Sequence, residues 1–157
     1  MTSELEEKLV TALKSKGAHI SFAESCTSGL LAAGLVNVSG ASEVFEASFV
    51  TYSNAQKCKV LGVKEESIEA YTEVSGIVAE QMAKGAKEKA GAEYALSTTG
   101  YAGPTGGTKE NPVGTVYIGV ATPESVKSYR YVFPGSREEV RNAAVEKAYQ
   151  LLLEAFA

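Results

Sequence analysis

The 157-residue sequence predicts a three-layer α/β/α domain built on a mixed, mostly parallel sheet. Apolar runs rich in β-branched and aromatic residues alternate with segments of helical periodicity as far as residue 98, which is typical of strands joined by helices. Two further apolar runs, 113–121 and 126–133, are separated by one short turn and therefore predict an antiparallel hairpin. The length fits one domain that spans residues 1–157.

The first half of the chain begins with an amphipathic helix. Ser3 and Glu6 have the spacing of a capping box, and Gly17 is expected to end the helix. Beyond it we expect strands over 18–24 and 45–53, the second with Phe45, Phe49 and Val50 in the core, and helices over 29–37 and from the Ser53 cap to Leu61.

The second half continues the alternation before the hairpin. Residues 64–73 predict a short surface helix and loop, and Ser75 caps a longer helix that ends at Gly91. A strand over 94–98 leads into a Gly-rich loop that continues to Pro112. The last helix opens with a capping box at Ser136 and Glu139. Its final turn, 151–156, has more apolar residues than one buried face needs, which predicts a homodimer or larger homo-oligomer.

Composition excludes several classes of protein. A net charge of −4 argues against a general binder of nucleic acid or acidic membranes, because both need basic surface. No apolar run approaches the roughly 20 residues needed to cross a bilayer, and the acidic N-terminus is unlike a signal peptide. Cys26 and Cys58 are too few for a zinc site and suggest a reducing compartment. We therefore expect a soluble cytoplasmic protein without metal or cofactor.

The most informative stretch is the apolar run 18–24 followed by Ser25-Cys26-Thr27-Ser28-Gly29 and then a helix. The first N–H groups of a helix have no intrahelical partner and carry partial positive charge. Such a site can hold an anion or an oxyanion beside the hydroxyls of Ser25, Thr27 and Ser28. The alternative is ordinary N-capping by these side chains, and the local pattern alone leaves it open.

If Ser25 is a nucleophile, a base must take its proton. The one histidine, His19, precedes it by six residues of an extended strand, about 20 Å, so a Ser-His-Asp triad within the chain is not expected. Lys57 and Tyr52 are the remaining bases near strand ends, and each requires a pKa lowered from about 10. The alternative is that Lys57 is a solvated surface lysine, which is the more frequent case. Cys26 is expected to be a small buried residue rather than a rival nucleophile.

Two other features suit an anionic ligand. The Gly100–Gly107 loop brings backbone N–H groups close to whatever it covers, although it is neither a P-loop nor a dinucleotide motif, and a tight connector is the alternative. Arg137 and Arg141 lie one turn apart at the start of the last helix, where the dipole disfavours cations. A bound anion would account for them.

Several separated motifs agree with one known family in order and spacing. They are Ala23-Glu24-Ser25-Cys26-Thr27-Ser28-Gly29, Phe49-Val50-Thr51-Tyr52-Ser53-Asn54-Ala55-Gln56-Lys57 with Leu61-Gly62-Val63, Thr99-Gly100-Tyr101-Ala102-Gly103-Pro104 with Pro112-Val113-Gly114-Thr115-Val116, and the tail Phe133-Pro134-Gly135-x-Arg137. Together they resemble the CinA C-terminal domain family over nearly the whole chain. The resemblance implies a three-layer α/β/α fold and nicotinamide-nucleotide amidase activity, which converts nicotinamide mononucleotide to nicotinate mononucleotide and ammonia.

The resemblance also assigns roles. The family's Ser-Tyr-Lys set falls on Ser25, Tyr52 and Lys57, so that Ser25 attacks the amide carbon and Lys57 with Tyr52 handles the proton. Backbone N–H groups from Thr27 to Gly29 would stabilise the oxyanion. The substrate-binding residues that the resemblance implies for the small-molecule nucleotide are Thr27, Ser28, Gly29, Thr99, Gly100, Gly103, Thr105, Arg137 and Arg141.

The sequence departs from the family pattern in two ways. Ser28 stands where the family usually has a second Gly, and the N-terminal domain resembling molybdopterin-binding proteins, which often precedes this one, is not found in these 157 residues. Because a fold does not fix an activity, two alternatives stay open. One is a module that binds a mononucleotide without reacting with it, and the other is a serine amidase for another amide.

Overall fold

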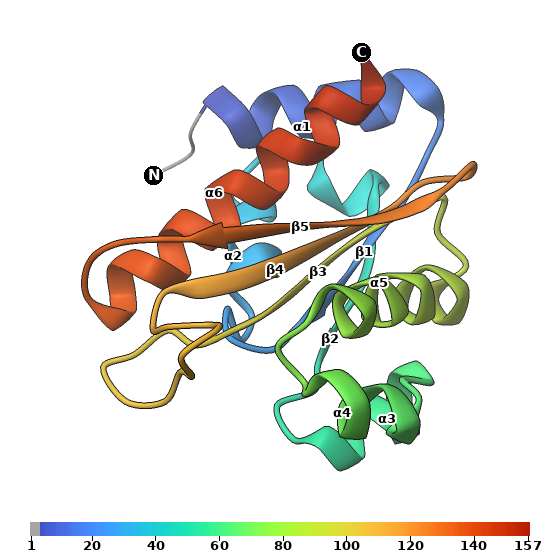
Figure 1. Ribbon diagram of the computed structural model, residues 1–157. Coiled ribbons are helices and arrows are strands. Elements are labelled where there is room, and N and C mark those ends of the chain that lie inside the picture. Colours follow the sequence, from blue (N-terminus) through green and yellow to red (C-terminus); the bar gives the residue numbers. More distant parts are fainter. Residues whose placement is uncertain (1–3) are drawn as a thin grey trace.

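The computed structural model describes residues 4–157, so Ser3 and its expected capping box lie outside the described residues. Five strands form one sheet with the order β2-β1-β3-β4-β5 (Figure 1). The strands are β1 (Ile20–Glu24), β2 (Phe45–Val50), β3 (Tyr94–Gly100), β4 (Thr115–Ala121) and β5 (Val126–Val132). The helices are α1 (Glu4–Lys16), α2 (Leu30–Leu35), α3 (Asn54–Leu61), α4 (Glu65–Tyr71), α5 (Gly76–Ala90) and α6 (Arg137–Phe156), with a 3₁₀ turn at Ala41–Glu43.

The sheet is mixed, as predicted. Strand β1 pairs in parallel with β2 and β3, whereas β4 runs antiparallel to β3 and β5. Four of the five strands therefore point the same way. Glu24 at the end of β1 is level with Val50 of β2 and Thr98 of β3. The residues that follow these three strands consequently meet at one edge of the sheet, which is where ligands bind in many open α/β sheets.

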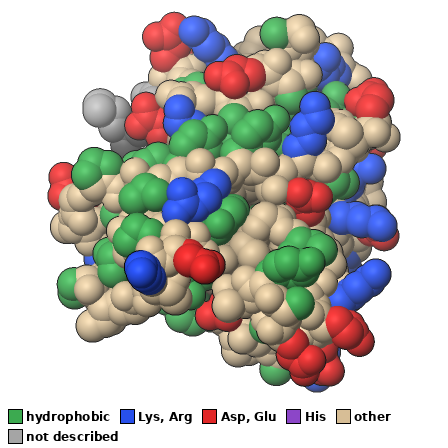
Figure 2. Space-filling model, viewed as in Figure 1, with side chains coloured by type: hydrophobic (Ala, Val, Ile, Leu, Met, Phe, Trp, Pro, Cys, Tyr) green, Lys and Arg blue, Asp and Glu red, His purple; other side chains and the backbone are tan. Residues whose placement is uncertain are grey.

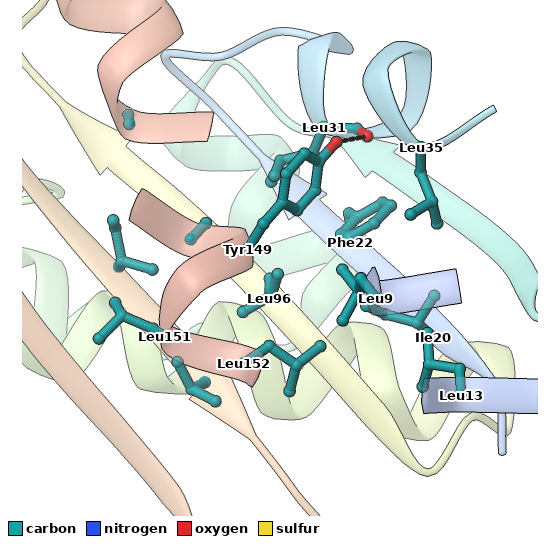
Figure 3. Packing of buried hydrophobic residues seen from close by; sticks show 14 of the residues in the cluster. Leu9, Leu13, Ile20, Phe22, Leu31, Leu35, Leu96, Tyr149, Leu151 and Leu152 are labelled. Atoms are coloured by element: carbon teal, nitrogen blue, oxygen red, sulfur yellow. Dashed lines mark hydrogen bonds between the residues drawn. The ribbon is translucent and has the colours of Figure 1, made fainter. Parts of the chain in front are cut away.

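Helices cover both faces of the sheet and complete the three layers. In Figure 1, α1, α2 and α6 lie on one side, and α5 with α3 and α4 on the other. The larger apolar cluster lies on the α6 side and includes Phe22, Leu96 and Leu152 (Figure 3). There the hydroxyl of Tyr149 on α6 donates a hydrogen bond to the carbonyl of Leu31 on α2 (Figure 3). This bond ties the helix that follows Ser25 to the last helix of the chain.

The predicted caps are confirmed within the described residues. The side chains of Ser53, Ser75 and Ser136 accept hydrogen bonds from the first turns of α3, α5 and α6, and Ser136 with Glu139 forms a complete capping box. The predicted end of the second strand is wrong, because β2 stops at Val50 rather than at residue 53. Val50 is 48% exposed instead of buried, since β2 is an edge strand.

The apolar last turn of α6 packs within the chain. Leu151 and Leu152 are buried, and the ring of Phe156 contacts that of Tyr94 with centroids 4.9 Å apart and lies under the ammonium of Lys16. These contacts explain the apolar turn without a second chain. The homodimer or larger oligomer therefore stays a prediction that this turn no longer supports.

The surface carries charges of both signs. On the face seen in Figure 2, acidic and basic side chains are interspersed and no broad basic stripe crosses it. Acidic residues gather at the α4 end, where Glu65, Glu66 and Glu69 are exposed. Among residues 4–157, no helix is both long and apolar enough to cross a membrane.

Candidate active site

Ser25 lies at the edge of the sheet where the parallel strands end. It follows β1 directly, and its backbone N–H donates a hydrogen bond to the carbonyl of Thr98 on β3, 3.1 Å away. The residue is only 8% exposed. Its hydroxyl is therefore held in a defined, largely water-excluded position.

Lys57 reaches Ser25 from α3. The side chain is 1% exposed, and its Nζ lies 3.1 Å from the Ser25 Oγ, 2.9 Å from the carbonyl oxygen of Thr51 and 3.3 Å from that of Tyr52. Burial lowers the pKa of Lys57, and the nearby carboxylate of Glu73 offsets part of that effect. The alternative of a solvated surface lysine is therefore wrong.

The contacts around the Lys57 amine suit a general base. A carbonyl oxygen can only accept, so the carbonyls of Thr51 and Tyr52 each take one N–H of the amine. A neutral amine has two N–H groups and one lone pair. With the two N–H groups on the carbonyls, the lone pair is directed at the Ser25 hydroxyl. The geometry thus allows Lys57 to accept the proton of Ser25.

The side chain of Tyr52 faces away from this amine. It is 60% exposed, and its hydroxyl accepts a hydrogen bond from Nη2 of Arg137 at 3.1 Å. Nη1 of Arg137 donates to the carbonyl of Gly103 at 2.7 Å. Tyr52 thus contacts Lys57 with its backbone and Arg137 with its phenol, and Arg137 in turn contacts the Gly-rich loop. Tyr52 contacts the lysine through its carbonyl, not through the phenol that the resemblance placed in proton transfer.

The start of α2 holds an anion, but the anion is the protein's own Glu24. This fully buried carboxylate has five donors and thereby occupies the N–H groups expected to meet a ligand. The N–H of Gly29, one of those expected to meet the substrate oxyanion, thus already has a partner within the protein. The donors to Glu24 are the N–H groups of Gly29, Leu31 and Ala32 and the hydroxyls of Thr27 and Ser48, at 2.7–3.2 Å.

Comparison with known proteins places this geometry in a family. A family model described as the CinA C-terminal domain matches residues 2–156. The chain belongs to the CinA C-terminal domain family. A protein of Enterobacter agglomerans named nicotinamide-nucleotide amidohydrolase PncC is 44% identical over 154 residues, which cover 98% of this chain and 94% of the relative.

Longer relatives and solved structures agree with this membership. A protein of Caldicellulosiruptor saccharolyticus, named as a competence-damage inducible protein, is 50% identical over 94% of this chain, which spans only 36% of that relative's length. The crystal structure of the competence/damage inducible protein CihA from Agrobacterium tumefaciens superposes with a TM-score of 0.93 at 37% identity, covering 96% of this chain and 93% of the other. The three-layer fold is thus that of CinA-family proteins.

Within this CinA-family domain, several expected ligand-binding side chains are turned inward. The hydroxyl of Thr27 bonds Glu24 and Thr98, and that of Thr99 donates to the carbonyl of Glu73, so both hydroxyls have partners within the protein. Gly100 has no room for a side chain, because a Cβ there would lie 2.5 Å from the carbonyl oxygen of Thr115. The contacts of Thr27 and Thr99 concern the side chains alone and leave the backbone N–H of Thr27 unengaged within the described residues.

Other expected residues of the CinA pattern lie at the surface. Ser28 and Thr105 are exposed, and Ser28 has the left-handed φ of 45°. Arg137 is exposed, whereas Arg141 is half-buried and donates to the carbonyls of Cys26 and Thr27 at 2.9 and 3.1 Å. Arg137 is thus the more exposed of the two arginines.

The structure also explains why Cys26 and His19 take no part in the site. Burial raises the pKa of Cys26 to about 11, so it remains a thiol at neutral pH and a poor nucleophile. His19 lies at the other end of β1, where its Nδ1 is 3.1 Å from Glu93. Among the described residues, no group of three or more His, Cys, Asp or Glu side chains is arranged to hold a metal ion.

Three further residues of the site were not predicted from the sequence. They are Glu24, which ends β1 and whose carboxylate binds the start of α2, Thr51, whose carbonyl accepts from Lys57, and Glu73, whose carboxylate raises the pKa of that lysine. Glu24 carried a readable signal, since a charged residue ends a fully buried strand just before a helix. The sequence holds no such signal for Thr51, which acts through its backbone carbonyl. It holds none for Glu73, which is brought near Lys57 by the packing of α4 against α5.

Proposed function

We propose that this chain hydrolyses the carboxamide of nicotinamide mononucleotide to nicotinate mononucleotide and ammonia through a serine acyl-enzyme. The observation that carries the proposal is the 3.1 Å contact between the buried Lys57 amine and the Ser25 hydroxyl. A serine with an adjacent, desolvated lysine is an established arrangement for acyl transfer. The 44% identical relative named nicotinamide-nucleotide amidohydrolase supports the choice of substrate.

In the first half of the reaction, the Ser25 Oγ attacks the amide carbon while its proton passes to the Lys57 Nζ. The C–N bond then breaks, and Lys57 returns the proton to the leaving nitrogen, which departs as ammonia. The pyridine carboxyl group remains as an ester on Ser25. In the second half, water attacks this ester while Lys57 takes one of its protons, the bond to the Ser25 Oγ breaks, Lys57 returns the proton to that oxygen, and nicotinate mononucleotide leaves. No metal or redox cofactor is needed for this balance.

The N–H of Thr27 is the donor best suited to the oxyanion. The N–H groups of Ser28 and Gly29 are engaged by the Ser25 carbonyl and the Glu24 carboxylate, whereas that of Thr27 forms no hydrogen bond within residues 4–157. The N–H of Cys26 forms a hydrogen bond to the sulfur of its own side chain, so it too is engaged. Losing one such oxyanion donor costs about 10²–10³-fold in kcat in enzymes where it has been tested.

Arg137 is the proposed phosphate ligand. It is exposed at the edge of the site, between the Tyr52 hydroxyl and the Gly103 carbonyl, and its guanidinium keeps further donors. The exposed Thr105 and Ser28 lie on the two loops that remain for ribose and phosphate contacts. The proposal places this enzyme in the cytoplasm, and its assembly into a homodimer or larger oligomer stays a prediction from the sequence.

The test is ammonia release from nicotinamide mononucleotide by the purified chain, with Ser25→Ala in parallel. Turnover by the parent that disappears in the variant would support both the reaction and the nucleophile. Binding of the nucleotide without ammonia release would favour a binding module instead. Release from a different amide only would redirect the proposal to that substrate.

A further inference from the structure

The carbonyl of the peptide unit between Cys26 and Thr27 accepts a hydrogen bond from Arg141, a residue of α6. Nε of Arg141 donates to the Cys26 carbonyl at 2.9 Å, and Nη2 donates to the Thr27 carbonyl at 3.1 Å. Arg141 reaches this loop across 115 residues of sequence, so the contact is tertiary rather than a local cap. On the other side of the same peptide unit, the N–H of Thr27 has no partner in the described part of the chain.

The direction of this N–H follows from the contact with Arg141. In a trans peptide, the C=O and N–H bonds point in opposite directions, so a cation on the Cys26 carbonyl turns the Thr27 N–H away from α6. A charge on the carbonyl also polarises the peptide and strengthens its N–H as a donor. The Thr27 side chain is fixed by Glu24 and Thr98, which prevents the peptide from rotating.

We propose that Arg141 is a positioning residue that aims the Thr27 N–H at the developing oxyanion, and that it does not bind the substrate phosphate. This inference rests on the proposed amidase function. Two of its donors are already engaged by loop carbonyls and its side chain is half-buried, whereas Arg137 is exposed at the edge of the site. The sequence leaves open which of the two arginines meets the phosphate, and their different contacts in the structure support Arg137.

The first test compares two substrates that differ only by the phosphate, nicotinamide mononucleotide and nicotinamide riboside. For Arg141→Gln we expect kcat to fall about 10–100-fold on both substrates with KM changed by no more than about twofold, because a transition-state contact is lost. Arg141→Lys should recover part of the loss, since an ammonium can still reach one carbonyl. Arg137→Gln should instead raise KM for the mononucleotide alone.

The matched control is Lys147→Gln. It removes a cation from the same helix as Arg141, since the Lys147 ammonium lies over the ring of Tyr131. It should leave kcat and KM unchanged. An Arg141→Gln variant that raises KM for the mononucleotide only, with kcat intact, would overturn the inference and make Arg141 a phosphate ligand. If Arg141→Gln does not fold, as judged by its thermal midpoint, Arg141→Lys answers the same question through its kcat.

A second readout separates this inference from the proposed substrate. The rate at which a fluorophosphonate probe labels Ser25 depends on the nucleophile and its oxyanion donors but not on a nucleotide. We expect labelling to slow about 10-fold or more in Arg141→Gln and to be unchanged in Lys147→Gln. Labelling of the parent without hydrolysis of the mononucleotide would reject the proposed function alone. Equal labelling of parent and Arg141→Gln would reject the positioning role, and a parent that neither labels nor turns over would reject both.

Discussion

The Nζ of Lys57 lies 3.1 Å from the Oγ of Ser25, and the lysine is 1% exposed. Within residues 4–157 this amine takes part in no ion pair, and its partners are a hydroxyl and two carbonyls. Burial without a carboxylate in ion-pair contact disfavours the ammonium and lowers the pKa of Lys57, although Glu73 offsets part of this effect. The site therefore pairs a serine with a base whose burial prepares it to accept a proton.

Removing either member of this pair should abolish turnover while preserving the fold. We expect Ser25→Ala and Lys57→Met each to lower kcat by at least about 10³-fold, because the two act as one unit. The thermal midpoint should stay close to that of the parent, since methionine keeps most of the volume of the lysine. Lys59→Met, on the exposed side of the same helix, is the control and should change neither property. A large drop in midpoint for Lys57→Met would assign the lysine a structural role.

The pH dependence should report the amine directly. Only neutral Lys57 can act as base, so kcat/KM should rise with pH through the pKa of Lys57, at a midpoint below the ordinary lysine value of about 10.4. Glu73 raises this pKa, so Glu73→Gln should move the acid limb to lower pH. Glu69→Gln, which removes an exposed carboxylate from α4, should not move it. A profile without an acid limb would contradict Lys57 as the base.

Glu24 should be the most sensitive carboxylate for stability. It receives five donors and no acceptors, so an amide in its place would direct an NH₂ group against N–H and O–H donors. We expect Glu24→Gln to lower the free energy of unfolding by about 2–4 kcal/mol, measured by urea denaturation. Glu88→Gln on the exposed face of α5 should change it by less than about 0.5 kcal/mol. Equal stability of both variants would mean that the buried carboxylate does not anchor α2.

The features predictable from sequence were those set by local pattern. Strand periodicity and the caps at Ser53, Ser75 and Ser136 depend on residues within a few positions of each other, and the structure confirms them. The burial of Lys57, by contrast, could not be predicted from local sequence. This lysine shares a short, largely polar helix with the exposed Lys59, and only the packing of α3 against the loops after β1 and β2 distinguishes the two lysines.

The start of α2 shows the same limit for capping. Local rules assign capping to Ser25, Thr27 or Ser28, because N-caps are read from the residue before the helix. The actual acceptor, Glu24, reaches the N–H of Leu31 seven residues further along and also binds Ser48 on the neighbouring strand. Its role needs the sheet to be assembled, and no window of sequence contains that information.

Ser28 and Gly29 offer a test of backbone strain beside the nucleophile. Ser28 has a φ of 45°, where a Cβ is unfavourable, its side chain is exposed, and its hydroxyl forms no hydrogen bond within the described residues. Ser28→Gly should therefore raise the free energy of unfolding by about 0.5–1 kcal/mol in urea denaturation. Gly29 has a φ of 99°, and a Cβ added there would meet no atom within 4 Å, so Gly29→Ala should lower it by at least about 1 kcal/mol through backbone strain alone. The Ser28 hydroxyl contacts none of the groups proposed to react, so Ser28→Gly should keep its kcat, and a lost ribose or phosphate contact should change KM alone. A lower kcat would assign the Ser28 hydroxyl a role in the reaction.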